Sequence, residues 1–432
     1  MFTDFFTFHN LNLVQILIVG IGYLMPIPLA FIAVKLWHHY RQERFIMGIK
    51  WVLLEIQVPR DVIKSPAAME LIFSNALYHQ SLKGFWEEYI IGAPWMWFSL
   101  EIASVDGRVR FYIRTPSRIR DLVETQIYAQ YPQAKVVESE DYVWNVPQYT
   151  KNGDWNVWGA DFIKKDDDVR TIKTYKQMDD MKSGIKEEFK IDPLTPTIEY
   201  MGSLPKGQQM WMQILVRQNI KKYHAPLSHK HVGFNEYAEE YLRNMLEMYT
   251  KYGKEAGLGG IDTFEVRAPS FLEPIVKQMG SCMGQLHFDV GIRIMVMADK
   301  RLHSLEKFNE LRKACRLVFR QYAQPNSNEL VRINATQFDA PWSDPTGLAL
   351  TNIKKRMLDW YRLRVFFHPP IQYSFNYPAI FDMFFPSKRP TTFVLSLEEL
   401  ATIYHFPGMV SETPSFKRIE SKIAKPPSDL PM

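Results

Sequence analysis

The sequence is poor in cysteine and lacks the motifs of nucleotide-driven and zinc-dependent enzymes. Its 432 residues include two cysteines, Cys282 and Cys315, which cannot build the multi-bridge framework of a small secreted domain. No G-x-x-x-x-G-K-[ST] segment occurs, and Gly253-Lys254 is followed by glutamate instead of the hydroxyl residue that holds magnesium. H-E-x-x-H and C-x-x-C are also absent. These absences exclude a P-loop motor in this sequence and favour a reducing compartment.

Charged residues are missing from a long stretch near the N-terminus. No Asp, Glu, Lys or Arg occurs from residue 5 to residue 34, and the apolar run extends from Leu11 to Trp37. A bilayer core needs about 20 apolar residues in a helix, so residues 11–37 predict a transmembrane helix, kinked at Pro26 and Pro28. Trp37 and Tyr40 suit the headgroup layer. The alternative is a buried helix of a soluble protein.

Basic residues predict the orientation of this helix. Lys35, Arg41, Arg44 and Lys50 follow the apolar run, whereas Asp4 is the one charged residue before it. Because positive residues stay on the cytoplasmic side, residues 1–10 are expected outside and the bulk of the chain inside. The net charge of +5 suits an anionic inner leaflet. The sequence therefore predicts a single-pass protein of the cytoplasmic membrane.

Residues 50–145 predict a first ferredoxin-like module with the order βαββαβ. Two helices are expected to begin at Ser65-Pro66 and Thr115-Pro116, where a hydroxyl residue precedes proline. Asp106-Gly107 is a strong signal for a tight hairpin between two strands. The predicted strands are residues 51–59, 96–104, 108–114 and 135–138.

Residues 165–340 predict a second βαββαβ module, interrupted by a helical insertion at 218–285. An irregular C-terminal extension, 341–432, follows and ends in a proline-rich tail, with a capping box at Ser396–Glu399. The predicted fold class is α+β: one N-terminal transmembrane helix, two ferredoxin-like modules and this extension. The predicted strands of the second module are residues 169–175, 210–217, 287–297 and 330–333.

One candidate metal site and one candidate nucleic-acid face emerge from the residue pattern. His224, His229 and His231 lie within eight residues, a spacing that could bring imidazoles around a metal ion, but no carboxylate or cysteine stands beside them. A solvated polar loop is the favoured interpretation. The second candidate is the outer face of one predicted strand, which could contact phosphates or be a plain exposed face. Its residues are Arg108, Arg110 and Arg114.

Three segments carry a resemblance to a known family: SPAAMELIFSNALYH, FSLEIASVDGRVRFYIRTPSRIRDLVETQIYAQYP and SLEELATIYHFPG. They resemble the N-terminal, non-motor region of membrane-associated ATPases of type IV secretion and conjugative DNA transfer. The likeness covers about residues 50–430. In that family a transmembrane segment and this region precede a P-loop motor, and the stretch like SLEELATIYHFP leads into the motor. The region has no established activity, so the resemblance implies no catalytic residues.

The sequence ends at Met432, where the resemblance would place the motor. We therefore expect the motor to be a separate polypeptide, or the chain to be a stand-alone paralogue. The predicted function is a membrane-anchored scaffold that docks a P-loop traffic ATPase at the cytoplasmic face, with no enzymatic activity and no cofactor. Expected partners are membrane lipids, the ATPase and other secretion subunits, with DNA and a second copy of the chain as further candidates. The alternatives are a membrane-tethered nucleic-acid-binding protein and a membrane enzyme.

Overall fold

The chain forms two compact units in the computed structural model. The smaller unit comprises residues 1–49, 81–94 and 370–385, and the larger comprises residues 50–80, 95–369 and 386–432. The structure describes residues 25–59, 64–78, 83–180, 192–255, 273–315, 318–323, 327–337, 342, 344–368 and 391–407.

The larger unit is built on one antiparallel sheet, which has nine strands within the described residues. A short two-stranded ribbon, β7–β8, forms a separate sheet. The strands are β1 (Trp51–Gln57), β2 (Phe98–Val105), β3 (Arg108–Pro116), β4 (Lys135–Glu138), β5 (Trp155–Lys164), β6 (Gln208–Gln218), β7 (Tyr223–His224), β8 (His231–Val232), β9 (His287–Asp299), β10 (Leu330–Ile333) and β11 (Phe393–Ser396).

The order of the strands shows two halves joined edge to edge. The path across the sheet is β10-β5-β9-β6-β2-β3-β1-β4, and β11 also pairs with β9. The order β2-β3-β1-β4 is that of a βαββαβ unit, and β6-β9-β5-β10 repeats it. Because β2 pairs with β6 along its length, the two halves share one sheet instead of forming separate modules.

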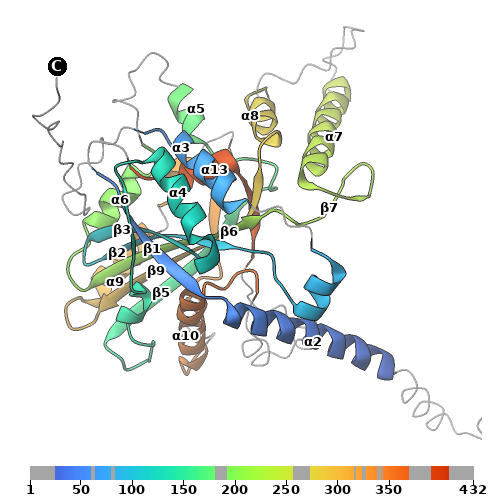
Figure 1. Cartoon of the computed structure of the whole chain (residues 1–432). Coiled ribbons are helices and arrows are strands. Elements are labelled where there is room, and N and C mark those ends of the chain that lie inside the picture. The colour runs from blue at the N-terminus through green and yellow to red at the C-terminus, as the bar shows by residue number, and fades with distance from the viewer. Residues whose placement is uncertain are drawn as a thin grey trace, which may run out of the picture. The chain divides into compact units, whose positions relative to one another are not determined.

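Helices cover both faces of this sheet. On one face, α3, α4, α6, α9 and α13 pack over the main apolar core; on the other, α10 and the short helix η5 cover a second cluster. Figure 1 shows α3, α4 and α13 on one side and α10 on the opposite side. The helices of this unit are α3 (Ala67–Ile72), η2 (Phe73–Leu77), η4 (Ser117–Ile119), α4 (Arg120–Gln130), η5 (Tyr142–Asn145), α5 (Tyr175–Asp180), α6 (Thr195–Gly202), α7 (Phe234–Glu255), α8 (Glu273–Met283), α9 (Leu305–Ala314), η7 (Arg320–Tyr322), α10 (Leu348–Leu363) and α13 (Leu397–Ile403).

The predicted tight hairpin between β2 and β3 is confirmed. Asp106 and Gly107 have φ angles of 53° and 77°, and the flanking Val105 and Arg108 are cross-strand partners. Two consecutive residues with positive φ are what a two-residue turn of this type requires. A Cβ atom on Gly107 would lie 2.5 Å from the Leu204 carbonyl oxygen, so the site also lacks space for a side chain.

The predicted strand at 169–175 is wrong, and β5 (Trp155–Lys164) is the first strand of the second half. Both faces of β5 are covered, so its apolar residues do not alternate with polar ones. Its charged residues are buried: Asp161 pairs with Arg293 at 2.7 Å and Lys164 pairs with Glu399 at 2.9 Å. These long-range partners are what make a strand with buried charges possible.

The described part of the smaller unit consists of α2 (Pro26–Gly48) and η3 (Trp86–Ile91). The Arg41 Nε donates a hydrogen bond to the Ile90 carbonyl oxygen at 2.9 Å. The His38 Nε2 lies 3.1 Å from the carbonyl oxygen of Glu88, and its ring stacks on Tyr89. Side chains in the second half of α2 therefore hold η3.

The predicted fold class needs correction at its N-terminal end. No helix within the described residues is long and apolar enough to cross a membrane. From Lys35 onward α2 also carries Arg41, Glu43 and Arg44, so charged residues interrupt the apolar composition of the helix. The prediction of a transmembrane helix at 11–37 is therefore wrong over its described part, and residues 11–24 lie outside the described residues. The observed class is α+β with a large antiparallel sheet.

Candidate functional site

Residues 391–407, which contain β11 and α13, form a segment that contacts both halves of the sheet; we call it the bridging segment. From Phe393 to Phe406 almost every residue is buried. The predicted capping box is confirmed: the Glu399 backbone N–H donates to the Ser396 Oγ, and the Ser396 backbone N–H donates to the Glu399 carboxylate. The local sequence thus starts α13 at the point where β11 ends.

A buried ion pair holds the bridging segment to the second half of the sheet. The Lys164 Nζ at the end of β5 lies 2.9 Å from the Glu399 Oε1, and the two side chains are 1% and 2% exposed. The same carboxylate accepts a hydrogen bond from the Ile172 backbone N–H at 2.8 Å. β11 pairs with β9 in register, with Ser396 opposite His287. A charge buried to this extent is stable only with its partner in place.

Aromatic side chains hold the same segment to the first half. The Tyr404 Oη donates to the Tyr112 carbonyl oxygen on β3 at 3.0 Å, and its ring contacts Phe73 and Phe111. The Phe406 ring lies edge-on to Phe111 with centroids 5.6 Å apart. The bridging segment therefore fixes the two halves to each other across one face of the sheet.

A small pocket lies beside the bridging segment, between it and helices α7 and α8. It has room for about one water molecule. Its polar lining includes Asp168, Cys282, His287 and Ser396. Burial raises the pKa of Asp168 to about 6, although the Lys164 charge and the Val394 backbone N–H act in the opposite direction.

The nucleophilic and basic groups of this pocket are not activated. Burial raises the pKa of the Cys282 thiol to about 12, so it stays protonated at neutral pH. Burial, followed by the Lys164 charge, lowers the pKa of His287 to about 4, so the ring is neutral there. The Ser396 hydroxyl donates to the Cys282 sulfur at 3.6 Å. This arrangement stabilises the helix end and does not generate a thiolate.

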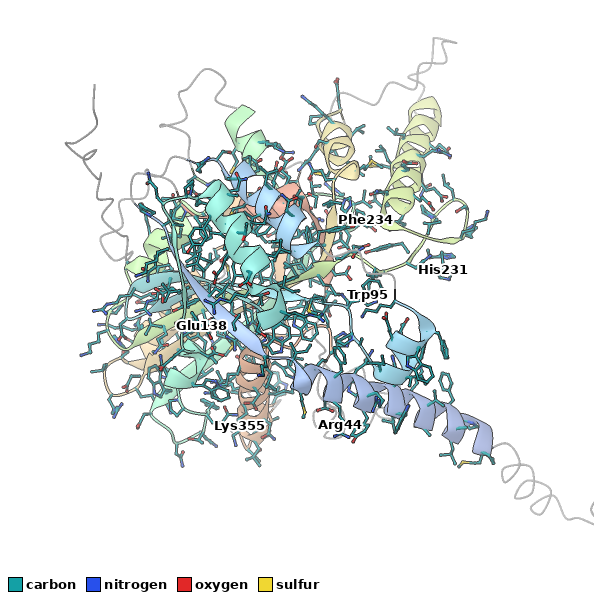
Figure 2. The ribbon with its side chains drawn as sticks, viewed as in Figure 1. Arg44, Trp95, Glu138, His231, Phe234 and Lys355 are labelled. Atoms are coloured by element: carbon teal, nitrogen blue, oxygen red, sulfur yellow. The ribbon has the colours of Figure 1, made fainter. Side chains whose placement is uncertain are left out.

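The three predicted histidines come together on the β7–β8 ribbon. His224 and His231 are cross-strand partners, and the ring centroid of His224 lies 5.6 Å from those of both His229 and His231. All three are exposed, and Figure 2 shows His231 on the ribbon, away from the large sheet. Within the described residues, no group of three or more His, Cys, Asp or Glu side chains has a geometry that could hold a metal ion.

The three predicted arginines of β3 have three different environments. Arg108 is exposed, whereas Arg110 lies 3.6 Å from the Glu55 carboxylate. The Arg114 guanidinium lies over the Trp51 ring at 4.4 Å. Burial, together with the positive charge of Arg364, lowers the pKa of Arg114 to about 9. They therefore do not form one continuous exposed surface for phosphates.

The predicted anchor residues are only partly described. Leu11 lies outside the described residues. Pro26 and Pro28 lie in the first turn of α2, where proline is tolerated because the backbone N–H has no helical partner. Trp37 and Tyr40 are 55% and 42% exposed, and their ring centroids are 6.2 Å apart.

A buried polar network beneath α10 was not predicted from the sequence. The Arg364 guanidinium contacts the Glu101 carboxylate of β2 at 2.9 Å and also pairs with Asp141. The Tyr142 hydroxyl donates to Glu101 at 2.8 Å and also lies 2.8 Å from the Tyr361 hydroxyl. Burial raises the pKa of Glu101, but the Arg364 charge and the hydrogen bonds from Arg364, Ser99 and Tyr142 outweigh burial and lower the pKa. Glu101 within an apolar strand was the available signal, but its partners lie far away in sequence.

The chain matches no protein-family model. No curated protein is similar enough in sequence to match it.

Proposed function

We propose that this chain is a non-catalytic scaffold of a type IV secretion-like machine, and that it positions a separate P-loop traffic ATPase. The observation that carries this proposal is the bridging segment. Its residues SLEELATIYHFP resemble the stretch that leads into the motor in the secretion ATPases, and here they pack against both halves of the sheet. A motor that docks beside this segment would be held in a defined position.

Energetic considerations support a positioning role for the bridging segment. A tether that only connects two domains needs no buried charges, because a solvated linker satisfies its polar groups with water. This segment instead buries the Glu399 carboxylate against Lys164 and satisfies it with two backbone N–H groups. Lys176 extends the contact by pairing with both Glu398 of α13 and Glu70 of α3. The segment and the two halves thus form one packed platform.

The proposal is tested by purifying the tagged full chain from its own cells under mild conditions. We expect a P-loop ATPase to co-purify in a fixed ratio. Glu399→Gln should reduce the recovered ATPase, because it loosens the bridging segment, while Glu329→Gln should not, because the Glu329–Lys165 pair is half-exposed. Recovery of the chain without any ATPase would refute the scaffold. Equal recovery with both variants would refute the role of the bridging segment.

A further inference from the structure

The β7–β8 ribbon and its flanks form a strongly basic surface; we call residues 221–231 the basic hairpin. This stretch reads KKYHAPLSHKH and contains no acidic residue. The three lysines and three histidines are all exposed. None of the five side chains of Lys222, Lys230 and the three histidines makes an ion pair with the described residues. The fold therefore presents two lysines and three imidazoles that form no ion pair with the described residues.

A buried tyrosine holds the basic hairpin against α7. Tyr223 is 8% exposed, and its ring packs on Phe234 and Tyr237 with centroids 5.4 Å and 5.0 Å away. Its loop is closed by a hydrogen bond from the Ala225 N–H to the Lys230 carbonyl oxygen at 2.9 Å. The buried tyrosine fixes one side of the ribbon, so its imidazoles are presented on a preformed surface.

The acidic groups near the basic hairpin are engaged by backbone N–H groups, by a tyrosine hydroxyl or by Lys221. The Glu240 carboxylate of α7 accepts the backbone N–H groups of Leu227 and Ser228 at 3.1 Å and 2.9 Å. Asp167 accepts the Tyr237 hydroxyl, with which it forms a short hydrogen bond. Asp168 is stabilised in part by the charge of Lys221, whose Nζ lies over the Tyr223 ring at 4.9 Å. Lys221 is therefore the one lysine of the hairpin with an acidic neighbour.

We propose that the basic hairpin binds single-stranded nucleic acid, with its lysines at the phosphates and its imidazoles against phosphates and bases. Planar histidine rings are among the side chains on which unpaired bases stack. A positively charged track with stacking rings is the usual surface for single strands. A lipid surface fits less well, because Leu227, 38% exposed, is the one large exposed apolar side chain in residues 221–231. This inference does not depend on the scaffold function.

The lysines should make the binding depend on the salt concentration. For a single strand the slope of log K against log salt is about −0.7 for each phosphate neutralised. Lys222 and Lys230 together predict a slope of about −1.4.

The test uses the full chain and a fluorescein-labelled single-stranded DNA oligonucleotide, with binding followed by anisotropy over a salt series at pH 8. The triple variant His224→Gln, His229→Gln, His231→Gln removes the stacking rings and should weaken binding at least about fivefold at each salt concentration, with the slope of the wild type. Lys222→Ala with Lys230→Ala should flatten the slope by about 1.4. Because all five side chains are exposed, both variants should retain the thermal midpoint of the wild type.

The matched control removes two exposed lysines outside the basic hairpin. Lys165→Ala with Lys313→Ala lowers the net charge by the same amount as the lysine variant and should leave the slopes unchanged. Three results would overturn the proposal: a histidine variant that binds as tightly as the wild type, a control variant that weakens binding as much as Lys222→Ala with Lys230→Ala, or binding to anionic phosphatidylserine vesicles without binding to the oligonucleotide.

Discussion

The Lys164–Glu399 ion pair allows a sharp test of how the bridging segment is held. Both side chains are at most 2% exposed, and the Lys164 Nζ has as its other acceptor the Asp168 carbonyl oxygen at 3.0 Å. Removing one partner of such a pair leaves a buried charge uncompensated, which costs about 3–5 kcal/mol. Glu399→Gln keeps the shape of the side chain and removes its charge. We expect it to lower the free energy of unfolding by about this amount.

The neighbouring pair Lys165–Glu329 is the natural control. Its side chains are 61% and 50% exposed, and the charged atoms are 3.5 Å apart. An exposed pair contributes about 0–1 kcal/mol, so Glu329→Gln should have little effect. The double variant Lys164→Met with Glu399→Gln should recover part of the loss, because the uncompensated lysine charge is then absent.

The assay is equilibrium unfolding in urea at pH 7, followed by tryptophan fluorescence and circular dichroism. The decisive comparison is between Glu399→Gln and Glu329→Gln. If the two variants differ by less than about 1 kcal/mol, water reaches the Lys164–Glu399 pair and the reasoning on burial fails. If the double variant is less stable than Glu399→Gln, the uncompensated lysine is not the source of the loss.

Two further predictions concern packing and ionisation in the larger unit. Gly159→Ala should lower stability by about 1–3 kcal/mol in thermal melts, because a Cβ atom there would lie only 2.3 Å from the Met295 sulfur and 2.9 Å from Met357. The control is Gly280→Ala, which lies in a helix with open space around it and should be neutral or stabilising. Asp168 has a raised pKa of about 6, so between pH 4 and pH 6 the folded state binds a proton that the unfolded state has lost, and stability falls as the pH rises. Asp168→Asn removes this effect, so its stability relative to the wild type should increase by about 2 kcal/mol from pH 4 to pH 7 in urea titrations, and an unchanged difference would contradict the burial of the carboxyl group.

Several elements could be predicted because residues close in sequence specify them. Asp106-Gly107 forms the tight turn that its positive φ angles require, and Ser396 with Glu399 caps α13 within one turn. The predicted limits of β4 and β10 agree with the structure. In each case the stabilising contacts lie within a few residues or follow from the alternation along a strand.

The N-terminal helix shows where composition alone misled. The uncharged stretch before Lys35 predicted a membrane-spanning helix, but the described helix α2 starts at Pro26 and continues through Arg41 and Arg44. A side chain of its second half, Arg41, binds the backbone of η3. Residues far apart in sequence decided what the described helix contacts.

The tertiary structure alone decided the features on which both proposals rest. Asp161 and Lys164 lie in a strand that composition did not reveal, because their partners Arg293 and Glu399 are 132 and 235 residues away. The sequence by itself determined the turns, caps and most strands, and it marked three nearby histidines. Whether a polar side chain is buried with a partner or left exposed depends on which surfaces meet in the folded chain. For this reason Lys164 is buried against Glu399, whereas the imidazoles of the basic hairpin are exposed.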